Sequence, residues 1–116
     1  MARWFILLAV FAAAACESAW SVQGQVRAPE GSGTPVAGAL MTLRCAGEPD
    51  RTARSDRAGL FELGGDGLGP RLDCAILVTA AGRASARIAL RDVCEDPSEA
   101  DGKCSIAVLD VPLARR

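Results

Sequence analysis

The stretch Trp20-Ser-Val-Gln-Gly-Gln-Val26 (WSVQGQV) places an apolar or small residue at every second position, with Ser or Gln between them. A period of two is typical of a β-strand with one buried face, because successive side chains of a strand point to opposite sides. The same alternation returns in Ala39–Cys45 and is clearest in Cys74–Ala80. The sequence therefore predicts a chain built from strands.

Shorter strands are expected around these three, at Thr52–Ser55, Phe61–Leu63, Ile88–Leu90 and Ser105–Leu113. Turn-forming residues separate them, at Pro29–Pro35, Asp56–Gly59 and Gly64–Pro70. Pro112 suits an edge strand or the end of a strand, because proline has no N–H to donate. Seven short strands without an amphipathic helix predict an all-β sandwich, and a partly open barrel is the alternative.

The composition limits the size and chemistry of the protein. The chain has 116 residues, 13 basic and 14 acidic, for a net charge of −1. Once an N-terminal signal is removed, about 100 residues make one domain with a modest core. The near-neutral charge gives no reason to expect a nucleic-acid partner. The chain has no His, which excludes a Ser-His-Asp triad and the usual zinc sites.

The N-terminus has the pattern of an export signal. Arg3 supplies a positive end, and the apolar run Trp4–Ala15 is too short for a membrane span, which takes roughly 20 residues. The small residues before Cys16 resemble the lipobox of bacterial lipoproteins, whose cysteine is lipidated and becomes the mature N-terminus. Residues 1–15 are therefore expected to be a lipoprotein-type signal peptide, and 16–20 a lipidated tether. The alternative is ordinary cleavage after Ala15, with Cys16 unmodified.

The number of cysteines supports this interpretation. A chain with five cysteines leaves one unpaired in an oxidising compartment, and lipid on Cys16 removes the odd one. The remaining four can pair as disulfides; they are Cys45, Cys74, Cys94 and Cys104. A metal site is not predicted, because these four show no C-x-x-C spacing and no His accompanies them. Spacing alone does not choose among the three possible pairings, and four reduced thiols are the alternative.

Three segments resemble one family. They are Val22–Val26 with Pro35–Arg44, Ser55–Leu63 with its aspartate-glycine turn and aromatic strand, and Ile76–Gly82. In this order and spacing they are similar to the carboxypeptidase regulatory-like domain, from about residue 21 to 90. The resemblance implies a transthyretin-like (prealbumin-like) β-sandwich of about seven strands, assigned to residues 21–116. Arg83, where the family commonly has an aromatic residue, and the four cysteines depart from its pattern.

The resemblance also implies a disulfide pairing. In this sandwich the second and fifth strands are antiparallel neighbours, so Cys45 at the end of one would meet Cys74 at the start of the other. Cys94 and Cys104 would then close the acidic loop between the last two strands. The family's motifs are turn and core motifs, which specify fold rather than function.

Other candidate sites have a more ordinary explanation. The run Gly65-x-Gly67-x-Gly69 lacks the strand-to-helix context of a phosphate loop and is interpreted as a flexible hairpin loop. The acidic stretch Glu95–Gly102 could suggest calcium, but Ala100 breaks the order of oxygen ligands, so a solvated loop is expected. Lys103, the only lysine, is interpreted as a surface charge. No catalytic residue and no cofactor are assigned.

The functional expectation is a non-enzymatic, lipid-anchored module of the cell envelope with a binding or structural role. It would act through its loops or through an edge strand that takes up a partner strand. The expected partners are the membrane, through lipid on Cys16, and an unidentified envelope protein or glycan. The alternatives are a lipoprotein that binds a small ligand such as a carbohydrate, and an unusual hydrolase. The domain is expected to face the periplasm from the outer membrane, because Glu17 is not the aspartate of inner-membrane retention.

Overall fold

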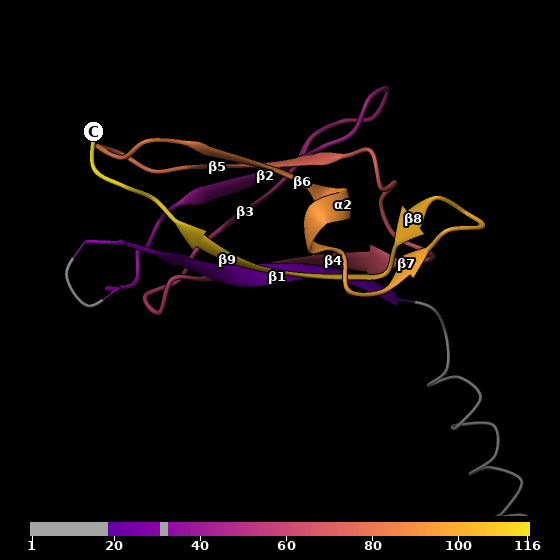
Figure 1. The fold of residues 1–116 in the computed structure, drawn as a ribbon, viewed down its shortest axis with the longest axis horizontal. Coiled ribbons are helices and arrows are strands. Elements are labelled where there is room, and N and C mark those ends of the chain that lie inside the picture. The colour runs from indigo at the N-terminus through magenta and orange to yellow at the C-terminus, as the bar shows by residue number, and fades with distance from the viewer. Residues whose placement is uncertain (1–18, 31–32) are drawn as a thin grey trace, which may run out of the picture.

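A computed structural model describes residues 19–30 and 33–116. The predicted signal peptide at 1–15 and Cys16 lie outside the described residues. Seven strands form two sheets that pack face to face (Figure 1). One sheet has the order β4-β1-β9, and the other has the order β3-β2-β5-β6. The predicted all-β sandwich is thus confirmed.

The strand bounds follow the predicted alternation closely. The first sheet consists of β1 (Ala19–Arg27), β4 (Leu60–Asp66) and β9 (Ile106–Pro112). The second consists of β2 (Leu40–Arg44), β3 (Arg51–Arg54), β5 (Ala75–Thr79) and β6 (Ala86–Ala89). Because β9 pairs only with β1, it is an edge strand, and Pro112 ends it as predicted.

The central strand β1 joins the two ends of the chain. It runs antiparallel to β4 and parallel to β9, with Ser21 opposite Ile106 and Arg27 opposite Pro112. Gly24 permits this packing, since a Cβ there would lie 2.4 Å from the Leu109 carbonyl oxygen and 2.9 Å from Phe61 Cζ. Gly24 therefore allows β9 and Phe61 to approach β1 closely.

The core lies between the sheets and comes from every second residue of the strands. Met41, Ile76 and Val26 are fully buried there, and each such side chain contributes about 1.5–3 kcal/mol of transfer free energy. Trp20 is only 7% exposed and belongs to this core. Because β1 begins at Ala19, Trp20 is part of the sandwich and not of the predicted tether at 16–20.

Two local features differ from the prediction. The strand expected at Ile88–Leu90 is wrong at its end, because β6 stops at Ala89 and a helical turn, α2 (Leu90–Val93), follows. The Leu90 N–H donates to the Cys74 carbonyl, which directs the fully buried Leu90 side chain between the sheets. The loop expected from Gly64 is shorter, because β4 continues to Asp66 in register with β1.

The expected acidic loop is a small hairpin of β7 (Pro97–Ser98) and β8 (Lys103–Cys104). A disulfide joins Cys94 to Cys104 at its base, and a second joins Cys45 to Cys74 between β2 and β5. This is the pairing that the resemblance implied, and disulfides of this kind are characteristic of an oxidising compartment. Within the described part of the chain, no helix has both the length and the hydropathy of a membrane span.

Candidate functional site

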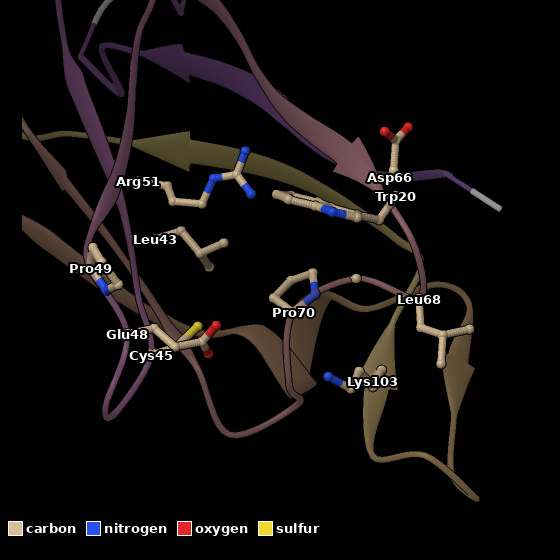
Figure 2. A pocket seen from close by; sticks show the side chains of 11 residues that line it. Trp20, Leu43, Cys45, Glu48, Pro49, Arg51, Asp66, Leu68, Pro70 and Lys103 are labelled. Carbon is tan, nitrogen blue, oxygen red and sulfur yellow. The ribbon is translucent and has the colours of Figure 1, made fainter.

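A pocket of about 260 Å³ opens at the end of the sandwich where β1 begins and β4 ends (Figure 2). We call this end the pocket end; it comprises residues 45–50, 66–74 and 94–105. Drug-sized ligands occupy pockets of roughly 300–1,000 Å³, so this one suits a smaller solute. Its lining combines apolar and charged side chains: Trp20, Leu43, Cys45, Glu48, Pro49, Arg51, Asp66, Leu68, Gly69, Pro70 and Lys103.

The Trp20 indole forms one wall and holds Arg51 in place. The guanidinium carbon of Arg51 lies 4.8 Å from the ring centroid, and its Nη2 donates to the Gly64 carbonyl at 3.2 Å. Gly65 packs on the same indole, since a Cβ there would lie 2.9 Å from Trp20 Nε1. The indole is therefore covered, and Arg51, rather than the aromatic ring, is the group presented to a ligand.

The opposite wall places Lys103 through close backbone packing. The Cys104 N–H donates to the Pro70 carbonyl at 2.9 Å, and Gly69 has φ +101°. A Cβ on Gly69 would lie 2.0 Å from the Cys104 carbonyl oxygen, so only glycine allows this loop to pack on β8. The half-buried Lys103 side chain points into the pocket (Figure 2). Its interpretation as a plain surface charge is thus corrected.

The turn after β2 supplies the third wall, and its Glu48 and Asp50 each form an ion pair with an arginine. Glu48 lies on it, facing Lys103 across the pocket (Figure 2). The Glu48 carboxylate lies 3.5 Å from Arg71 Nη1, and Arg71 Nη2 also donates to the Ala46 carbonyl at 2.7 Å. Arg71 therefore offsets part of the negative charge of Glu48. In contrast, neither Arg51 nor Lys103 forms an ion pair with any described residue.

The cysteines and glycines predicted as special have structural roles at this end. The four paired cysteines fasten the pocket walls, and Gly65 and Gly69 allow close packing against Trp20 and Cys104. Cys16 lies outside the described residues. Among residues 19–30 and 33–116, no three His, Cys, Asp or Glu side chains gather as a metal-binding group.

The sequence interpretation missed the gathering of Trp20, Arg51 and Lys103. These residues come from β1, β3 and β8, which meet only through the packing of the two sheets and the hairpin. One signal was available, because Lys103 is the only lysine in a chain whose other cations are arginines. Its place in the pocket could not be derived from that signal.

An edge strand was predicted as an alternative binding element, and β9, one of the edges of the two sheets, is only partly accessible. Ile106 and Val108 of β9 are 41% and 42% exposed. However, the Glu95 N–H donates to the Ile106 carbonyl at 2.8 Å, and Cys94 bridges to Ala107. Pro112 lacks an N–H at the other end, so only the middle of β9 could accept a partner strand.

Comparisons with known proteins show the fold and no family. No family model matches the sequence, and no curated protein matches it. The structure is similar to 3-chlorocatechol 1,2-dioxygenase from Rhodococcus opacus 1CP, with TM-score 0.60 and 13% identity over 86% of this chain. Hydroxyquinol 1,2-dioxygenase from Pseudomonas putida DLL-E4 matches over the same share, with TM-score 0.58 and 14% identity. The chain covers 61% and 57% of these two enzymes.

A pollen allergen shares the same sandwich over nearly its whole length. The plantain pollen allergen Pla l 1 matches 85% of this chain and 95% of its own, with TM-score 0.51 and 17% identity. At such identities the likeness concerns the fold alone. The sandwich therefore occurs both in enzymes and in a protein whose name describes no activity, and function has to be argued from the pocket.

Proposed function

We propose that this protein is a non-enzymatic, lipid-anchored binding module of the cell envelope, and that the pocket end is its binding surface. The pocket itself carries the proposal. It brings Arg51 and Lys103, two cations that pair with no acidic group of residues 19–30 and 33–116, into one hollow whose walls are fastened by both disulfides. Rigid walls reduce the entropy lost on binding, which favours a preformed recognition site.

A binding role fits the lining better than catalysis does. The pocket holds no Ser, Thr or His, and its Cys45 is in a disulfide, so a paired nucleophile and base is missing from this lining. Lys103 is the one possible nucleophile, and Glu48, which could serve as a base, is paired with Arg71. The likeness to dioxygenases concerns the fold alone and adds no catalytic group.

The loops of the pocket end are favoured over strand addition at β9. The accessible part of β9 is limited at its start by residues 94–96 and at its end by Pro112. Strand addition draws its affinity from a row of backbone hydrogen bonds, and a short row gives little. The pocket instead offers charged groups in fixed positions.

The lipid anchor is proposed from the Ala-Ala-Ala-Cys junction at 13–16 and from the parity of the cysteines. With Cys16 lipidated, Trp20 in the pocket wall would lie four positions along the chain from the anchor. At roughly 3.5 Å per residue, the pocket would then lie within about 14 Å of the anchored residue. Two acyl chains would make the attachment stable.

In-cell photo-crosslinking tests the binding surface. A photoreactive residue at exposed Leu68, on the pocket rim, should give a defined adduct with an envelope component. The same residue at exposed Ala58, in the turn before β4 at the other end of the sandwich, is the matched control. Adducts from both positions alike, or from Ala58 alone, would refute the pocket end as the binding surface.

Fractionation tests the anchor separately. Cys16→Ser should release the protein from membranes or block its processing, whereas the wild type stays in the membrane fraction until detergent is added. A wild-type protein found in the soluble fraction with a free N-terminal thiol would show that the anchor is wrong. This result would not contradict the proposed binding role of the pocket.

A further inference from the structure

We infer that the pocket recognises a small organic anion, in which an acidic head group is attached to a compact apolar body. This inference rests on the proposed function, because it names the ligand class of the same site. It depends on three features of the pocket: hydrogen-bond donors without partners, the balance of charge, and the apolar lining.

The donors are the first feature. A guanidinium has five N–H donors, and Arg51 uses one in a described hydrogen bond, to the Gly64 carbonyl. The three donors of Lys103 have no described hydrogen-bond partner. The Trp20 ring and the Gly64 carbonyl together hold the Arg51 guanidinium at the pocket, with its remaining N–H groups available to a ligand. A planar fork of this kind matches the oxygens of a carboxylate or phosphate.

The balance of charge is the second feature. In the part of the chain that the structure describes, the two cations that line the pocket form no ion pair. The facing Glu48 is neutralised in part by Arg71, which also pairs with Asp73 at 3.2 Å. The Asp66 carboxylate points away from Glu48 and Lys103 (Figure 2). The interior therefore favours a negative group. Glu48 opposes it weakly and would discriminate against ligands with more than one acidic group.

The apolar lining is the third feature. Leu43, Pro49 and Pro70 line the space between the charged groups, and the volume of about 260 Å³ limits the ligand to a small solute. A carbohydrate would need an exposed aromatic platform, but Trp20 is covered and Phe61 is buried. The geometry therefore points to a compact apolar body beside the acidic head group.

Titration with defined probes tests the ligand class. The full chain carrying Trp4→Phe has Trp20 as its only tryptophan, so its fluorescence reports on the group that Arg51 covers. The probes are cyclohexanecarboxylate, cyclohexyl phosphate, the neutral cyclohexylmethanol and the zwitterion leucine. We expect the two anions to bind about ten-fold more tightly than the alcohol, with the difference shrinking at high salt. The affinities for cyclohexanecarboxylate and cyclohexyl phosphate, compared with each other, show which acidic head group is preferred.

Charge variants give the direction of each contribution. Lys103→Met should weaken anion binding about ten-fold, because it removes a charged donor. Glu48→Gln should strengthen anion binding, because it removes a facing negative charge. Arg57→Met deletes one positive charge from an exposed turn at the other end and should leave the affinity unchanged. Circular dichroism confirms that each variant is folded before it is titrated.

Three outcomes would overturn the inference. Equal affinity for the alcohol and the anions would show a merely apolar pocket. Tighter binding of leucine, weakened by Glu48→Gln, would show a zwitterion site. No saturable response to any probe would reject a small-anion site. If one of these results is obtained and the photoreactive residue at position 68 still gives an adduct, the small-anion ligand class is wrong. The proposed function as a binding module would still be supported.

Discussion

The two ends of the sandwich are held together by different means. Two disulfides fasten the pocket end. The far end, which we define as residues 28–30, 33–38, 55–59, 80–85 and 113–116, has no disulfide and is held by hydrogen bonds and ion pairs. Arg83 donates to Glu30 at 2.7 Å and to the Leu113 carbonyl at 2.8 Å, while the buried Ser55 joins two backbone segments.

This difference shows how each end solves its packing problem. The far end connects its strands by segments whose backbone groups pair with one another. The pocket end must hold loops apart around a hollow, where few side chains are available for packing. The two disulfides stabilise the pocket end in place of the side-chain packing that the hollow lacks. The following predictions test this division, from the largest expected effect to the smallest.

Removal of the Cys45–Cys74 disulfide should give the largest loss. Its sequence separation of 29, against 10 for Cys94–Cys104, predicts about 3–4 kcal/mol against slightly less than 3 kcal/mol from the chain-entropy model. Double Cys→Ala variants of each pair, unfolded in urea, measure both values. The free energy of unfolding should fall more when the first pair is removed.

Peptide mapping without reductant tests the pairing itself. It should find no peptide that links Cys45 to Cys94, and such a peptide would contradict the pairing.

Replacing a tightly packed glycine by alanine should lower the free energy of unfolding at either end of the sandwich. Gly69→Ala at the pocket end and Gly59→Ala at the far end should each cost about 2–3 kcal/mol. Both have positive φ, and an added Cβ would lie 2.0 Å and 2.4 Å from a carbonyl oxygen. Gly47 and Gly82 also have positive φ but open surroundings, so Ala there should cost less.

The same two variants separate stability from binding. Gly69→Ala should also weaken probe binding, because it displaces the loop from β8 and with it Lys103. Gly59→Ala should leave binding intact in the folded fraction. Equal loss of binding in both variants would mean that the pocket depends on the whole sandwich and not on its own end.

Ser55→Ala should cost about 1–2 kcal/mol at the far end. The Ser55 hydroxyl accepts from the Ala39 N–H at 2.9 Å and donates to the Val36 carbonyl at 2.7 Å, so its loss leaves buried groups unpaired. Exposed Ser85→Ala is the control and should change the free energy of unfolding by less than about 0.5 kcal/mol. A similar small effect at Ser55 would show that another group or water replaces the hydroxyl.

Acid should weaken the far end slightly through Glu30. The hydrogen bond from Arg83 lowers the pKa of Glu30 below its ordinary value of 4.5, with a smaller contribution from a backbone hydrogen bond. A lowered folded-state pKa stabilises the protein above 4.5, and this contribution disappears as the pH falls through the folded value. Urea midpoints below pH 4.5 should therefore fall less steeply in Glu30→Gln. An unchanged slope would contradict the assignment.

Much of the fold could be predicted because its signals are local. Alternation along Trp20–Val26 and Cys74–Ala80 marked the strands, and Gly59 has the positive φ expected of the Asp56–Gly59 turn. The parallel pairing of β1 with β9 could not be derived, since it joins segments about 80 residues apart. Leu90 looked like a strand residue because a buried apolar side chain suits either element until the neighbouring chain is placed.

The candidate site was less predictable than the fold. The disulfide pairing could be predicted because a resemblance gave the strand order, and Cys45 and Cys74 follow from it. The chemical character of the pocket depends instead on how the Trp20 indole is covered, and Arg51 covers it. Arg51 reaches the indole because the β2–β3 hairpin packs over the start of β1, a contact with no local sequence signal.

The parallel pairing of β1 with β9 also has a mechanical consequence. The first described residue, Ala19, starts β1 at the pocket end, whereas the chain ends at Arg116, beyond the far end of β9 (Figure 1). A pull between the two termini would therefore act along the strands and load the β1–β9 hydrogen bonds in shear, all at once. They would have to break together, whereas a strand peeled from an edge breaks them one by one.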